Sequence, residues 1–241
     1  MLDTIFSVDR LSKSGISLFG VEHLSVILLG AILTIIVLKI NKESKLLEVL
    51  SSLIMAILHI CVYVWYYFSV ENFVTKGLPL HSCRIAIVFM MIGLLFKKDV
   101  LVKIASYWGF FGGILGLLLP SMEKYAFPHI LQISSFTIHI YLLVMSFYCL
   151  FVKKIGMTKK ECILGNIFTV IFLTFTYVIN IILGSHYSYT TQMPSVLAKI
   201  GITFPPIVCL LIVCTFYVVL GCAEYMLLNS SKKAKTDKSE V

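Results

Sequence analysis

Seven apolar runs dominate the chain, separated by short polar segments. A helix that crosses the hydrocarbon layer of a membrane needs roughly 20 apolar residues, and each run is close to that length. Strands are excluded, because no alternating barrel pattern is present and an open sheet edge cannot be satisfied in lipid. The pattern therefore predicts an all-α, polytopic membrane protein with seven transmembrane helices. We place them at residues 18–38, 47–68, 79–96, 100–119, 131–152, 162–183 and 204–228.

Composition supports this assignment. Of the 241 residues, 59% are hydrophobic and 13% are charged, and the mean hydropathy is +0.97. A soluble domain of this size could not bury so much apolar surface. We therefore expect residues 1–229 to form one membrane domain and residues 230–241 to form a disordered, lysine-rich tail.

Lysines are concentrated on one side of the predicted membrane domain, in the links after the first, third and fifth spans and in the tail. By the positive-inside rule, this distribution places the N-terminus outside and the C-terminus inside. The net charge of +8 comes largely from these segments. Because no basic helix with interleaved aromatic residues is present, we expect no nucleic-acid partner.

The six histidines lie toward the opposite, outer side. Ionisable groups in hydrocarbon are costly and are seldom present without a partner or a role, so this asymmetry predicts a polar site that opens toward the outer leaflet. For His59, in the middle of the second span, we favour a packing role. The candidate substrate-binding residues are His23, Arg84, His129, Asn180, His186 and Tyr187.

The most informative local string is Gly-Leu-Pro-Leu-His-Ser-Cys-Arg, which begins at Gly77. Its proline suits the first turn of a helix. His81 and Arg84 share a helix face, whereas Cys83 is rotated away from His81. Arg84 is one of two arginines in a chain with eighteen lysines, which points to bidentate recognition of phosphate or carboxylate. The structural alternative is an arginine that snorkels to the membrane surface.

His139 lies about two turns into the fifth span, with Ser135 on the same face. Burial and neighbours could tune it as a general base, with Cys83, Ser82 or Ser135 as the nucleophile. The alternative is a neutral histidine that ties two helices together. No span carries a His-x-x-x-His or Glu-x-x-His pair, so we expect neither a metal nor a cofactor. Four glycines of span four have the spacing of close helix packing: Gly109, Gly112, Gly113 and Gly116.

Several motifs resemble the YwaF family of bacterial seven-helix membrane proteins. They follow in order from about residue 78 to 194: Leu78-Pro79-Leu80-His81-x-Cys83, Tyr107-Trp108-Gly109, Leu119-Pro120, Phe127-Pro128-His129, His139, Asn180-x-x-Leu183-Gly184 and Tyr187 with Pro194. The resemblance implies a multi-pass protein of the bacterial cell membrane. A similar eukaryotic branch is described as a cysteine-dependent phospholipid acyltransferase with Pro-Cys-His at the start of the same span. Here leucine stands where that cysteine would fall, so His81 matches the branch better than Cys83 does.

Two functions follow from these residues. The first is a lipid acyltransferase or acyl hydrolase that acts on membrane phospholipid, with His81, Cys83 and His139 as catalytic residues and Arg84 on the lipid phosphate. The second is a non-enzymatic binder or carrier of an anionic lipid or small anion, with Arg84, His81 and His129 as the pocket. A third option is an assembly partner in a larger membrane complex.

Overall fold

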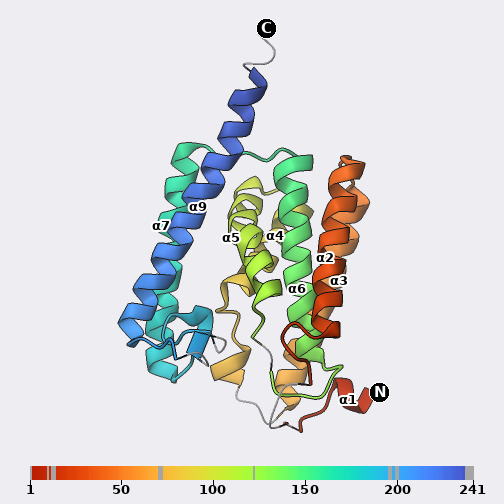
Figure 1. Cartoon of the computed structure of the whole chain (residues 1–241), viewed down its shortest axis with the longest axis vertical. Coiled ribbons are helices and arrows are strands. Elements are labelled where there is room, and N and C mark those ends of the chain that lie inside the picture. Colours follow the sequence, from red (N-terminus) through yellow and green to blue (C-terminus); the bar gives the residue numbers. More distant parts are fainter. Residues whose placement is uncertain are drawn as a thin grey trace.

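The computed structural model describes residues 2–9, 11, 15–69, 73–121, 123–194, 197–198 and 201–236. Within these residues every regular element is helical, as predicted (Figure 1). The elements are α1 (Leu2–Ile5), α2 (Val21–Ile40), α3 (Lys45–Phe68), the π-helical turn η1 (Phe73–Gly77), α4 (Ser82–Leu95), α5 (Asp99–Leu118), α6 (Ile130–Phe147) with its π-helical continuation η2 (Tyr148–Val152), α7 (Lys159–Leu183), the 3-10 turn η3 (Tyr187–Tyr189) and α9 (Pro206–Thr236).

Six described helices are long and apolar enough to cross a membrane: α2, α3, α5, α6 with η2, α7 and the part of α9 up to Leu227. The chain is therefore a multi-pass membrane protein. The third predicted span, 79–96, corresponds to α4, which has only 14 residues. α9 runs to Thr236, past the predicted end of the domain at 229, and residues 237–241 of the predicted tail lie outside the described residues.

Local sequence signals explain where several helices begin and end. Ser44 caps α3 by accepting the backbone N–H of Leu47, and Thr158 with Glu161 forms a capping box at the start of α7. At the other ends, Asn41 after α2 and Gly184 after α7 adopt the left-handed conformation that terminates helices. These caps fix the ends of α2, α3 and α7, which lie next to the polar groups of the two clusters described below.

α6 is the most buried of the long helices and packs against α2, α3, α4 and α5, while α7 and α9 pack on each other to one side (Figure 1). We call the end where α2 and α6 begin the histidine-rich end, and the end where α2 and α6 finish the lysine-rich end. The chain's N-terminus lies at the first of these ends and its C-terminus at the second (Figure 1). Which end faces the cell exterior stays a prediction.

Polar contacts join the α7–α9 pair to the other helices. The Tyr107 hydroxyl of α5 lies within hydrogen-bond distance of two acceptors, the side-chain oxygen of Asn166 on α7 and the backbone carbonyl of Tyr217 on α9, and its single proton serves one or the other. The neighbouring Trp108 donates its indole N–H to the Thr169 hydroxyl at 2.9 Å. One turn of α5 therefore holds both α7 and α9 in place.

Gly221 on α9 provides the space for this contact. A Cβ added at Gly221 would overlap the Tyr107 ring, which is buried and tethered through its hydroxyl. Gly221→Ala should therefore lower the free energy of unfolding by about 2 kcal/mol, as overpacked cores do. Thermal unfolding in detergent measures this. Gly165→Ala on α7 is the matched control, because a Cβ there meets only open space. Equal effects of the two changes would contradict this account.

Candidate functional site

His81 lies at the histidine-rich end, directly before α4, and is fixed by the η3 turn. The backbone N–H of Ser188 donates to His81 Nδ1 at 3.2 Å. The Ser188 hydroxyl donates to the Leu80 carbonyl at 2.7 Å and accepts the backbone N–H of Ser82 at 3.0 Å. One serine therefore satisfies the exposed backbone at the start of α4 and orients the histidine beside it.

Asn180 and Tyr187 hold the η3 turn in this position. The Asn180 side chain accepts from the Ser185 hydroxyl and from the Tyr187 backbone N–H, and it donates to the Tyr187 carbonyl and the Thr190 hydroxyl. The Tyr187 hydroxyl donates to the Val74 carbonyl at 2.9 Å and accepts the backbone N–H of Leu78 at 3.0 Å. The polar atoms of both predicted binding residues are thus occupied within the protein.

Arg84 is bound to the segment that precedes its own helix. One guanidinium nitrogen donates to the carbonyls of Lys76, Gly77 and Leu78, at 3.1, 3.1 and 3.2 Å. The guanidinium also lies over the Tyr66 ring, 5.7 Å from its centroid, in a cation–π contact. Arg84 thereby satisfies carbonyl groups at the end of η1 and directly after it. Its role on a lipid phosphate stays a prediction.

His139 on α6 faces α5. Its Nδ1 lies 2.7 Å from the Ser135 carbonyl, one turn earlier on the same helix. A Cβ at Gly116 would overlap the imidazole at Cδ2 and Nε2, so the ring occupies the space that the glycine leaves open. His139 also lies within electrostatic range of His81. The structure therefore places two of the three predicted catalytic residues at the same end of the molecule, with no hydrogen bond between them.

The partners of the two imidazoles imply opposite tautomers. A backbone N–H can only donate, so His81 Nδ1 is unprotonated and its neutral ring carries the proton on Nε2. A carbonyl can only accept, so His139 Nδ1 carries the proton and Nε2 keeps a free lone pair. Neither Nε2 is hydrogen-bonded to a described residue, and both side chains are only half-buried. The pair therefore offers one proton donor and one proton acceptor.

Cys83 follows His81 in the first turn of α4. Its thiol lies near the backbone N–H groups of Cys83 and Arg84 and within electrostatic range of the Arg84 charge. Burial opposes a thiolate at Cys83 and outweighs these groups, which favour one. Two tyrosines that we did not single out, Tyr189 of η3 and Tyr217 of α9, also lie within range of Cys83. The Tyr217 hydroxyl makes a 2.5 Å hydrogen bond with that of Ser82, so a residue of α9 reaches this group.

Three other predicted site residues lie farther along this end. His23 is buried, accepts the Phe19 N–H and bonds the Leu117 carbonyl at 2.6 Å, which joins the start of α2 to the end of α5. His129 is the N-cap of α6, and its Nε2 lies 3.0 Å from the Ser7 carbonyl. Burial lowers the pKa of His129, which favours its neutral form. His186 is exposed and bonds the Thr191 hydroxyl.

His59 differs from the other histidines because its buried Nδ1 has no hydrogen-bond partner among the described residues. It lies edge-on to Tyr63 and within electrostatic range of Arg84. Among the residues that the structure describes, no group of three or more histidine, cysteine, aspartate or glutamate side chains could hold a metal ion.

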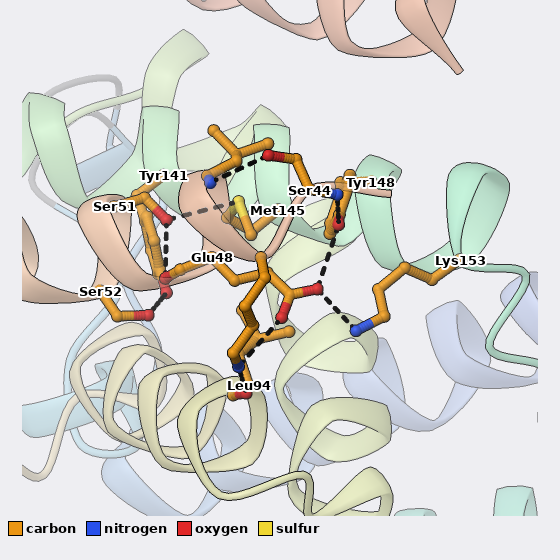
Figure 2. Close-up of polar contacts among 11 residues, drawn as sticks. Ser44, Glu48, Ser51, Ser52, Leu94, Tyr141, Met145, Tyr148 and Lys153 are labelled. Atoms are coloured by element: carbon orange, nitrogen blue, oxygen red, sulfur yellow. Dashed lines mark hydrogen bonds and ion pairs between the residues drawn. The ribbon is translucent and has the colours of Figure 1, made fainter. Parts of the chain in front are cut away.

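A second polar cluster, at the lysine-rich end, was missed by the sequence analysis (Figure 2). The buried Glu48 carboxylate bonds Lys153 Nζ at 2.6 Å, the Tyr148 hydroxyl at 3.0 Å and Lys45 Nζ at 3.3 Å. Lys45 Nζ also donates to the Leu94 carbonyl at 2.8 Å. This cluster joins α3 to the end of α4 and to η2. Glu48 was overlooked because a charge in the first turn of a span usually faces water.

Comparison with known proteins supplies a family. The sequence model of the TMEM164 family matches residues 12–225. No curated protein and no solved structure matches the chain. The matched region begins before α2 and ends within α9, so it includes five membrane-crossing helices and nearly all of the sixth. The chain therefore belongs to the TMEM164 family of transmembrane proteins.

Proposed function

We propose that this protein is a membrane-embedded lipid acyltransferase or acyl hydrolase, with its reaction site at the histidine-rich end. The observation that carries the proposal is the pair of opposite tautomers, in which His81 Nε2 offers a proton and His139 Nε2 offers a lone pair. Acyl transfer needs a base to activate a nucleophile and a donor to stabilise the developing oxyanion. Cys83, between these histidines in the sequence and half-buried, supplies the nucleophile.

These three residues account for every bond and proton that moves in the reaction. His139 Nε2 takes the thiol proton as Cys83 sulfur attacks the ester carbonyl, and the His81 Nε2–H donates to the oxyanion. When the tetrahedral intermediate collapses, the lipid alkoxide leaves with the proton held by His139, and the acyl group stays on Cys83 as a thioester. A lysolipid hydroxyl or water then attacks the thioester, with His139 again as the base. The first acceptor makes the protein a transferase and the second a hydrolase.

The resemblance to the YwaF family and to the cysteine-dependent acyltransferase branch supports this proposal, as does the half-buried state of the three side chains. The alternative, a binder or carrier of an anionic lipid or small anion, relies on Arg84, His81 and His129. It is less well supported, because one guanidinium nitrogen of Arg84 and both ring nitrogens of His129 already bond to the protein. It predicts no requirement for Cys83 or for a base.

Lipid mass spectrometry tests the proposal in membranes from cells that express the wild-type protein or single variants at matched levels. His139→Ala and Cys83→Ala should each abolish a wild-type-dependent change in lysolipid content or acyl-chain distribution, with a loss of at least about 100-fold in rate. Cys214→Ala is the matched control, since that α9 thiol takes no part in the proposed site and should keep full activity.

Two outcomes would decide against the enzyme. Identical lipid profiles with and without the wild-type protein would remove the evidence for chemistry on lipids. A profile change that survives both His139→Ala and Cys83→Ala would show that these residues do not carry the reaction. If in addition Arg84→Ala abolished lipid retention by the purified protein, the binder would become the better description.

A further inference from the structure

A cavity of about 480 Å³ lies at the lysine-rich end, opposite the candidate reaction site. It is enclosed by the start of α3, the turn between α4 and α5, and the segment that follows η2. Its charged lining residues are Lys45, Lys97, Lys153, Glu43, Glu48 and Asp99. No step of the proposed acyl transfer uses this cavity, so its charged lining calls for a separate explanation.

Glu48 is the one buried carboxylate in the lining, and its capacity to accept hydrogen bonds is largely used (Figure 2). One oxygen accepts from Lys153 and Tyr148, and the other accepts from Lys45. The Lys153 side chain is 22% exposed, whereas the Glu48 side chain is 5% exposed. Glu48 therefore holds the ammonium groups of Lys153 and Lys45 at the wall of the cavity.

The lysines retain most of their donors. Three ammonium groups carry nine N–H bonds, of which Lys153 uses one on Glu48 and Lys45 uses two, on Glu48 and the Leu94 carbonyl. Lys97 makes no hydrogen bond or ion pair with a described residue. Six of the nine N–H groups are thus available to a ligand. A ligand with several strong acceptor oxygens would satisfy them.

We propose that this cavity binds a phosphate group, either as free phosphate or as the headgroup of an anionic phospholipid. A phosphate offers several charged oxygens as acceptors, and hydrogen bonds to charged groups are the stronger class. Glu43, Asp99 and Lys97 are exposed, so water and salt screen the repulsion from the first two as well as the attraction of the third. The three lining lysines and three lining carboxylates balance in charge. Selectivity therefore comes from the directed donors and not from net charge.

Equilibrium binding to the full-length protein tests the proposal, with inorganic phosphate in one arm and nanodiscs that contain phosphatidylglycerol in the other. Lys97→Gln should weaken binding about tenfold, because it removes an unpaired ammonium from the cavity wall. Lys98→Gln is the matched control: the adjacent lysine carries the same charge but does not line the cavity, and its replacement should leave affinity unchanged. Glu43→Gln should strengthen binding, because it removes a carboxylate from the lining and leaves the Glu48 contacts intact.

The two arms identify the source of the phosphate. Binding of inorganic phosphate that responds to Lys97→Gln indicates a free anion, whereas a Lys97 effect confined to phosphatidylglycerol indicates a lipid headgroup. Absence of binding in both arms would overturn the proposal. So would equal losses in Lys97→Gln and Lys98→Gln, since that result describes general attraction between lysines and an anionic surface. The proposal does not depend on the acyl-transfer reaction.

Discussion

Replacing Gly116 with alanine should displace the His139 imidazole and lower the free energy of unfolding by about 1–3 kcal/mol. The added Cβ would overlap the ring, and the ring cannot turn away without losing its 2.7 Å hydrogen bond to the Ser135 carbonyl. Because the overlap includes Nε2, the proton acceptor of the proposed reaction moves as well. Any lipid-modifying activity should therefore fall by more than the loss of folded protein accounts for.

Gly112→Ala is the control for this experiment. Gly112 lies one turn away on α5, but a Cβ there has no neighbour within 4 Å. Thermal unfolding in detergent and lipid mass spectrometry at matched levels of folded protein give the two readouts. The account fails if Gly112→Ala and Gly116→Ala are equally harmful, because the effect would then reflect helix packing in general. A change in stability without a change in activity would exclude His139 from the reaction.

Glu48→Ala should lower the free energy of unfolding by about 3 kcal/mol, since it leaves the partly buried Lys153 ammonium without its carboxylate and the Tyr148 O–H without its acceptor. Most of the loss comes from Lys153 and Tyr148, because the Lys45 side chain is 52% exposed and contributes little. Chemical denaturation in detergent micelles measures the change. Glu43→Ala is the control, as Glu43 lines the same cavity without an ion pair to a described residue. A loss equal to that of Glu43→Ala would contradict the prediction.

The same pair predicts a pH dependence at the alkaline end. Burial alone would lower the pKa of Lys153, but the hydrogen bond and charge of Glu48 outweigh it and raise that pKa. The folded-state pKa then exceeds the unfolded one, so the stabilisation is fully present below the unfolded value and is lost as the pH rises through the folded one. The wild-type protein should lose stability above about pH 10, and Glu48→Ala should not show this step.

The position of a residue along the axis of its helix could be predicted from the sequence. Each helical residue adds 1.5 Å, so His81 and His139 could be assigned to the same end of the molecule from their positions in the predicted spans. Depth does not give the rotation of a helix or its lateral neighbour. For that reason Ser188, which orients His81, and Tyr217, which reaches Ser82 from α9, could not be predicted.

The errors in the prediction share a physical origin. Span 79–96 was drawn too long because hydropathy does not distinguish helical from extended apolar residues. The carbonyls before α4 are bonded to Arg84, and the helix begins only at Ser82. Glu48 was passed over because its main partner, Lys153, lies 105 residues away. Long-range side-chain pairs of this kind leave no periodic signal in a single sequence.

The short α4 changes what a polar molecule meets at this point in the membrane. Fourteen residues span about 21 Å, whereas the hydrocarbon layer is about 30 Å thick. The missing third is occupied by the short turns η1 and η3 and by residues 78–81, whose polar groups are satisfied by Arg84, Tyr187 and Ser188. A hydrophilic headgroup that enters from the histidine-rich end therefore crosses less apolar material next to α4 than next to the longer helices. The distance that it must travel through hydrocarbon to reach His81 is correspondingly short.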